Sequence, residues 1–164
     1  MPVFTGKRKK LSDLVCADAV VLELEATNRD EAIAELMRRL IAADRVPAEA
    51  EATVVRSILE RERKGSTGFG KGVAVPHAKH PSVPEIAGAI GVSRGGLDFH
   101  SLDGKPVHQI VLLVSPSNRS QDHIDAMQSV FVALHSDPFR RALREARSTQ
   151  DVFDLLRRTD AAAG

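Results

Sequence analysis

The spacing of apolar residues in the first part of the chain predicts one strand followed by two helices. Residues 19–24 (AVVLEL) are rich in Val and Leu and alternate toward their end, which is typical of a strand. A helix capped by Asn28 or Asp30 should follow, because apolar side chains then recur at helical spacing, namely Ala32, Ile33, Leu36, Leu40 and Ile41. A second amphipathic helix is predicted after Pro47, and Gly65 should end it.

Apolar runs dominate the middle of the chain. The runs at 72–77, 87–93 and 108–116 are short and bounded by turn residues, so each predicts a strand. The segment IVLLV (110–114) is apolar on both faces, which indicates a central strand covered by helices on either side.

The last part of the chain predicts helices. Ser120 is the expected N-cap of a helix with an apolar stripe, which consists of Ile124, Met127, Val130, Phe131 and Leu134. Pro138 opens another helical turn, and a last helix should begin at Ser148 or Thr149. The order strand, helix, helix, strands, helices predicts an α/β fold, a three-layer α/β sandwich with a mixed central sheet flanked by helices.

Length and charge narrow the class of protein. A chain of 164 residues suits one domain. With 23 Lys+Arg against 22 Asp+Glu the net charge is +1, which gives no reason to expect nucleic acid or an acidic membrane as partner. We expect a flexible basic tail over residues 1–10, one domain over 11–158 and a frayed tail over 159–164.

The cysteine content and the N-terminal sequence indicate the cellular compartment in which the protein is expected. Cys16 is the single cysteine, so no internal disulfide can form, and a reducing cytoplasm fits this. The basic N-terminus lacks the apolar stretch of a signal peptide, and no run approaches the roughly 18 apolar residues of a membrane span. We therefore expect a cytoplasmic protein that does not insert into a membrane.

Two histidines stand out by their positions at the ends of predicted elements. His77 directly follows Pro76, which interrupts the hydrogen-bond ladder, so His77 should end its strand where the chain leaves the sheet. His123 lies in the first turn of the helix that Ser120 opens, where the positive pole disfavours a charged imidazole. The two imidazoles are expected to meet at the rim, on either flank of the strand at 110–114.

Such a pair suits phosphoryl transfer. A neutral imidazole can act as the nucleophile, and the remaining requirement is to position the phosphoryl group and stabilise its negative charge. Arg61 is a candidate partner for phosphate oxygens, and Ser66 and Thr67 offer hydroxyl donors. Each feature also has a simpler interpretation. His77 alone fits a structural or merely exposed histidine, and Arg61 fits a solvated arginine at a helix end.

The block around His77 resembles a known signature. Arg61-Glu62, then the glycine turn Gly65–Gly68, then Gly72–His77 fill the pattern of the enzyme IIA domains of the phosphoenolpyruvate-dependent sugar phosphotransferase system. The resemblance is to the fructose/mannitol type, which includes the nitrogen-regulatory enzyme IIA proteins. His123 matches the second element of that family, a histidine that opens a helix after an apolar strand and a polar loop.

The resemblance implies roles for these residues. His77 would be phosphorylated, at Nε2, by the phosphocarrier HPr or an HPr-like protein. His123 would stabilise the phosphoryl group by hydrogen bonding, and Arg61 would neutralise its charge. Phe69 would lie either in the apolar rim that a partner covers or in the core. The resemblance implies no cofactor, no metal and no nucleic-acid partner.

Several alternatives remain open. A sugar-specific enzyme IIA passes its phosphoryl group to an enzyme IIB, whereas a regulatory one binds target proteins according to its phosphorylation state. A free-standing unit favours the regulatory variant. A zinc site built from His77, His80, His123 and Asp122 is a second hypothesis, and a target-binding module without phosphoryl transfer is a third. His80 and Arg119 have no place in the family pattern. Arg119 is either a second phosphate contact or a loop residue, and we favour the loop.

Overall fold

The computed structural model describes residues 9–163. Its helices are α1 (Leu11–Leu14), α2 (Arg29–Ala42), the 3-10 turn η1 (Ala48–Ala50), α3 (Glu51–Lys64), α4 (Ser120–Leu134), α5 (Asp137–Glu145) and α6 (Thr149–Ala163). Its strands are β1 (Val15–Val21), β2 (Gly68–Gly70), β3 (Val73–Ala74), β4 (His77–His80), β5 (Ala87–Leu97) and β6 (Val107–Pro116). Among these residues no helix is long and apolar enough to cross a membrane.

The six strands form one mixed sheet. The strand order is β1-β5-β6-β3-β2, and β4 also pairs with β6. β5 and β6 are antiparallel, whereas β3 and β4 both run parallel to β6. β6 is therefore the central strand, as the doubly apolar segment 110–114 predicted.

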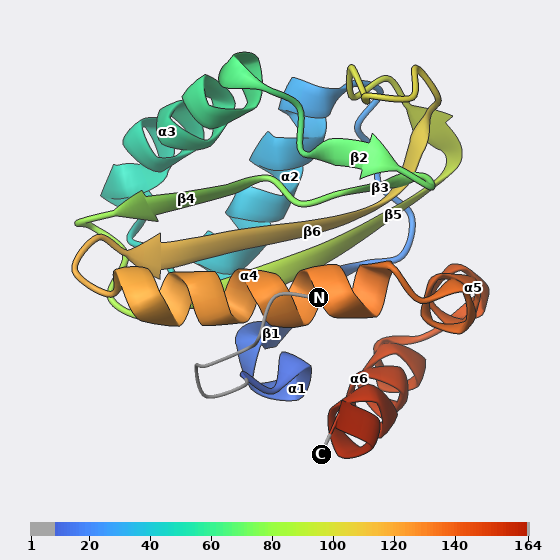
Figure 1. Ribbon diagram of the computed structural model, residues 1–164. Coiled ribbons are helices and arrows are strands. Elements are labelled where there is room, and N and C mark those ends of the chain that lie inside the picture. The colour runs from blue at the N-terminus through green and yellow to red at the C-terminus, as the bar shows by residue number, and fades with distance from the viewer. Residues whose placement is uncertain (1–8, 164) are drawn as a thin grey trace.

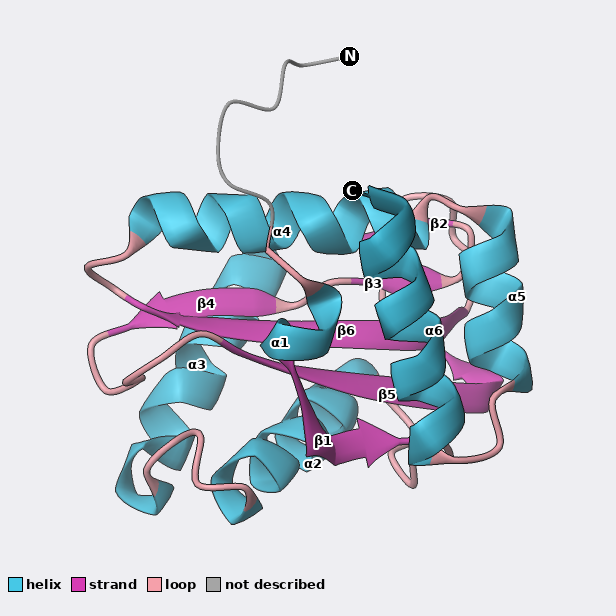
Figure 2. Ribbon diagram, turned by 90° about the horizontal axis from the view of Figure 1, so that it is seen from below, coloured by secondary structure: helices cyan, strands magenta, loops and turns pink. Residues whose placement is uncertain are grey.

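The sheet separates two layers of helices. α2 and α3 cover one face, and α1, α4, α5 and α6 cover the other (Figures 1 and 2). Side chains of β6 alternate between the two cores, so that Leu112 packs with α2 and α3 whereas Leu113 packs with α4. Both side chains are fully buried, which confirms the three-layer sandwich.

The chain around Pro76 departs from the prediction. β3 ends before Pro76, but the chain then rejoins β6, and His77 opens β4 instead of ending a strand. Proline lacks a backbone donor, yet its carbonyl still accepts a hydrogen bond, here from the N–H of Leu113 at 3.0 Å. Because β6 is long enough to pair with both segments, the strand is interrupted without leaving the sheet.

The glycine turn before His77 also contains regular structure. Gly68–Gly70 forms β2, which is antiparallel to β3. Gly70 and Gly72 connect the two strands with φ angles of 105° and 76°, a backbone conformation that a side chain would strain. The sequence indicated the turn but not this short hairpin.

Helix ends agree with the sequence in two places and differ in a third. Asn28 caps α2 by accepting the N–H of Glu31 at 2.9 Å, and Gly65 ends α3. α4, in contrast, begins at Ser120 itself, and its N-cap position is Arg119, which makes no side-chain capping bond. The Ser120 hydroxyl instead accepts a hydrogen bond from a lysine of β4.

The two predicted tails have different outcomes. Residues 1–8, most of the expected basic tail, lie outside the described residues, as does Gly164. The segment 159–164, expected as a frayed tail, is helical over its described part, because α6 continues through Ala163. Asp160 ties this end of α6 to the start of α1, where its carboxylate accepts hydrogen bonds from the N–H groups of Leu11 and Ser12 at 2.7 and 3.1 Å.

Candidate functional site

The rings of His77 and His123 lie beside each other between β4 and α4. Their ring centroids are 5.5 Å apart with the planes tilted by 43°. Val73 and Val75 belong to the core on the α4 side, and β-strand alternation puts His77 on that same face. His123 reaches it from the first turn of α4 and is only 7% exposed, whereas His77 is partly open to solvent. The pair can therefore share one small ligand that enters from outside.

His77 is held as a neutral nucleophile. Its Nδ1 lies 2.8 Å from the carbonyl oxygen of Val75, and because a carbonyl only accepts, Nδ1 carries the proton. Nε2 is then the unprotonated nitrogen. Burial lowers the pKa of His77, the hydrogen bond to Val75 opposes this, and the charge of Arg61 lowers it further. The net direction is downward, so the ring is mostly neutral at neutral pH.

His123 is also neutral, and its orientation is set by Ser115. The Nδ1 atom lies 2.6 Å from the Ser115 hydroxyl, which is itself fully buried. Burial lowers the pKa of His123 to about 4, with smaller contributions from His77 and from the positive charge of Lys79. Ser115 was not among the residues predicted for the site. Alternation from Leu113 would have found it, because it places a polar side chain on the α4 face of the apolar strand.

Arg61 lies in the last turn of α3 and beside the glycine turn. Its Nη1 donates to the carbonyl oxygen of Gly65 at 2.8 Å, and its side chain is exposed. Its positive charge acts on His77, whose pKa it helps to lower. The structure therefore brings the positive charge of Arg61 near His77.

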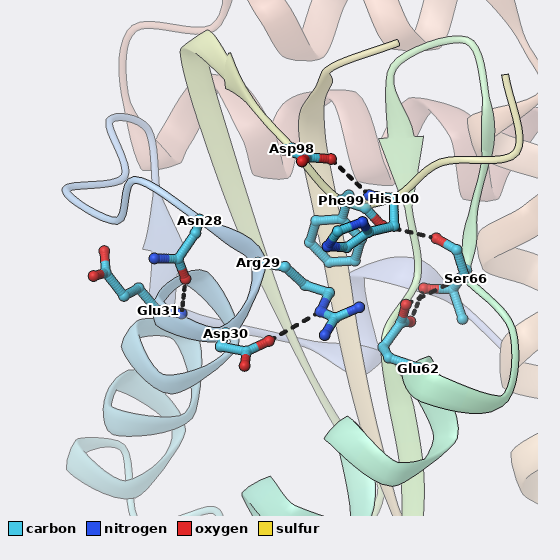
Figure 3. Close-up of polar contacts among 10 residues, drawn as sticks. Asn28, Arg29, Asp30, Glu31, Glu62, Ser66, Asp98, Phe99 and His100 are labelled. Carbon is cyan, nitrogen blue, oxygen red and sulfur yellow. Dashed lines mark hydrogen bonds and ion pairs between the residues drawn. The ribbon is translucent and has the colours of Figure 1, made fainter. Parts of the chain in front are cut away.

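The hydroxyls of Ser66 and Thr67 hold the glycine turn in place. Ser66 donates to the carbonyl oxygen of Phe99 at 3.0 Å (Figure 3). It also accepts the N–H of Gly68 at 2.9 Å. Thr67 is buried, and both its N–H and its hydroxyl bind the carboxylate of Glu62. These internal bonds differ from the expected role as phosphate donors, because the hydroxyls are already engaged.

Glu62 is a further residue whose role the sequence did not show. It is 2% exposed, and Figure 3 shows it beneath the turn, pointing toward Ser66. Both carboxylate oxygens accept hydrogen bonds from Thr67, five residues on. A buried carboxylate with two bonds of this kind fixes the turn that follows Arg61.

Phe69 packs within the protein. Its ring lies 5.2 Å from that of Phe131 and stacks on His135 at 4.9 Å, both in the C-terminal part of α4 or just beyond it. Phe131 is eight residues beyond His123, about 12 Å along a helix that rises 1.5 Å per residue. The structure therefore supports the packing interpretation of Phe69 over a place beside the histidine pair.

The zinc hypothesis finds no support in the described part of the chain. Within residues 9–163, no three His, Cys, Asp or Glu side chains are grouped so that they could hold a metal ion. His80 lies on the opposite face of β4 from His77, and its Nδ1 accepts the N–H of Ser82 at 3.1 Å. Asp122 forms an ion pair with Lys9 at 3.1 Å.

Comparisons of sequence agree with the signature around His77. Residues 13–159 match the family described as the phosphoenolpyruvate-dependent sugar phosphotransferase system, EIIA 2. A nitrogen regulatory protein of Bradyrhizobium diazoefficiens is 31% identical over 89% of this chain and 94% of its own length. The fructose-specific EIIABC component of Bacillus subtilis is 30% identical over 92% of this chain, which spans only 24% of that longer protein.

Solved structures share the fold. The nitrogen regulatory protein IIA-Ntr from Neisseria meningitidis superimposes with a TM-score of 0.80 at 28% identity, over 89% of this chain and 98% of that one. The enzyme IIA mannitol of Escherichia coli, solved in complex with phosphorylated enzyme IIB, has a TM-score of 0.73 at 22% identity, over 88% of this chain and 99% of that one. The mixed sheet and its flanking helices are thus the architecture of these proteins, and the chain belongs to the EIIA type 2 family of the phosphoenolpyruvate-dependent sugar phosphotransferase system, as a phosphotransfer component.

Proposed function

We propose that this phosphocarrier accepts a phosphoryl group on Nε2 of His77 from phosphorylated HPr or an HPr-like carrier. The observation that carries the proposal is the neutral histidine pair at 5.5 Å, in which His77 keeps its proton on Nδ1. The Nε2 lone pair attacks phosphorus, a new N–P bond forms, and the N–P bond of the donor histidine breaks. The donor imidazole regains its lone pair, so no further reactant is needed.

His123 and Arg61 are proposed to stabilise the charge that moves with the phosphoryl group. When the Ser115 hydroxyl donates to Nδ1 of His123, the neutral ring presents Nε2–H as a donor to a phosphoryl oxygen. Arg61 contributes a permanent positive charge from the side of α3. Ser66, Thr67 and Glu62 act indirectly, since they hold the turn between Arg61 and β2.

The phosphoryl group has two possible destinations, and one site serves both. It passes to an enzyme IIB in sugar uptake, or its charge changes the binding of regulatory target proteins. The similarity to a nitrogen regulatory protein supports the second destination, and the similarity to a fructose-specific component supports the first. Either reaction belongs in the cytoplasm, which the free, buried Cys16 fits.

Phosphorylation by a reconstituted chain of carriers tests the proposal. Purified protein is incubated with phosphoenolpyruvate, enzyme I and HPr, and we expect one acid-labile, alkali-stable phosphate that is absent from His77→Ala. His123→Ala should accept and donate the group slowly while it stays folded, and His100→Asn, a change of an exposed histidine, should behave as wild type. Unmodified wild-type protein, under conditions that phosphorylate a control enzyme IIA, would refute the function.

Purified partners separate the two destinations. Phosphorylated protein is mixed with candidate enzyme IIB domains, and loss of the label to one of them indicates sugar transport. Binding to a target protein that differs between the phosphorylated and unphosphorylated forms indicates regulation.

A further inference from the structure

Lys79 lies on β4, two residues after His77, and close to the histidine pair. Residues 77 and 79 share one face of β4, because strand side chains alternate. Ser120 and His123 share one face of α4, because they are three residues apart. His77 contacts His123, and Nζ of Lys79 donates to the Ser120 hydroxyl at 3.2 Å. Two parallel contacts therefore join the same face of β4 to the same face of α4.

The charge of the phosphoryl group can bind a further cation on the side that faces α4. A phosphoryl group of this kind carries about −1.5 to −2 charges at neutral pH. His123 is neutral there, whereas the phosphorylated His77 ring, which keeps its Nδ1 proton, and Arg61 each supply one positive charge. Lys9, another cation near α4, is already paired with Asp122. None of these positive charges comes from the side of α4, where a further cation would add to the stabilisation of the phosphoryl oxygens.

Lys79 has the position and the reach to bind the phosphoryl oxygens on that side. Its side chain is exposed, and its ammonium is held only by a neutral hydroxyl on the described protein. Two residues along a strand span about 6.6 Å, which the flexible four-carbon stem of a lysine can cover. An ion pair with a phosphoryl oxygen is stronger than a hydrogen bond to a neutral serine.

We propose that Lys79 is a third phosphoryl-binding group, which moves from the Ser120 hydroxyl to the phosphoryl oxygens when His77 is phosphorylated. Ser120 keeps the ammonium near the site in the unphosphorylated protein. The inference rests on the proposed function, namely that His77 carries the group. In this role Lys79 stabilises the phosphorylated protein, and the phosphoryl group lies between Arg61 and Lys79.

The equilibrium of phosphoryl transfer with HPr tests this role. Wild type, Lys79→Met, Lys79→Arg and the control Lys105→Met, which removes an exposed lysine of the β5–β6 loop, are each equilibrated with phosphorylated HPr. We expect Lys79→Met to lower the equilibrium constant about tenfold, which corresponds to about 1.4 kcal/mol. Lys79→Arg should retain most of the wild-type value, and the difference should shrink at high salt.

The outcomes separate this inference from the function on which it rests. If wild type takes up no phosphate, the proposed function fails. If wild type is phosphorylated and Lys79→Met has the same equilibrium constant, only the role of Lys79 is overturned. An equal loss in Lys105→Met, or no rescue by Lys79→Arg, also overturns it, because the effect would then not be a local charge. A second readout needs no phosphate: NMR titration should show a higher pKa of His123 in Lys79→Met.

Discussion

The buried His123 makes the stability of the folded protein depend on pH, and this can be measured without any partner. Burial lowers its pKa to about 4 in the folded protein. In the unfolded chain the same imidazole titrates at about 6.5. Between these values the unfolded chain binds a proton that the folded protein does not, so acid favours unfolding. The contribution of His123 is complete above pH 6.5 and is lost progressively as the pH falls toward 4.

The size of the effect follows from the two pKa values. Between about pH 7.5 and about pH 5, proton linkage removes about 2 kcal/mol of the free energy of unfolding at this one position. His77 changes stability in the same direction, because burial lowers its pKa too. The replacement His123→Asn keeps a polar group beside Ser115 but cannot titrate. Between the same two pH values, the free energy of unfolding of His123→Asn should therefore fall by about 2 kcal/mol less than that of wild type.

Urea unfolding at the two pH values, followed by circular dichroism, gives both free energies for each protein. His100→Asn serves as the control, because His100 is exposed and its φ of 54° suits asparagine. We expect the control to lose as much stability as wild type. If His123→Asn also loses as much as wild type, the imidazole is not held neutral by burial, and the account of the site is wrong. NMR titration of His123 then identifies its actual pKa.

Three further substitutions and one control test the packing and the local bonds of the fold that carries the site. Glu62→Ala removes the carboxylate that binds Thr67 and should lower the free energy of unfolding by about 1–3 kcal/mol in urea; a loss of a few tenths would contradict its buried role. Asn28→Ala removes the cap of α2 and should cost about 1 kcal/mol in the same assay. Leu112→Ala opens a cavity in the core between the sheet and α2, with an expected loss of about 2–5 kcal/mol. Leu102→Ala is the control for Leu112→Ala, because Leu102 is 76% exposed, and its free energy of unfolding should stay within about 0.5 kcal/mol of wild type. If the two leucine variants lose the same amount of stability, Leu112 does not belong to the core.

Local features of the sequence determined the elements and the family. The apolar stripes of α2, α3 and α4, the cap at Asn28 and the stop at Gly65 depend on residues a few positions apart, so they are visible in the chain itself. Ile124, which was expected in the stripe of α4, is an exception, because it is 50% exposed. The doubly apolar segment 110–114 identified the central strand for the same reason. The signature from Arg61 to His77 named the family before any coordinates.

The tertiary structure alone decided the finer parts of the site, because they depend on how distant segments meet. That His77 opens a strand follows from the length of β6, which lets the chain rejoin the sheet after Pro76. The bond from Ser115 to His123 depends on how α4 lies across β6. The inward hydroxyls of Ser66 and Thr67, and the contact of Lys79 with α4, have the same origin. Local periodicity specifies which residues form an element, but only packing specifies which side chains share a bond.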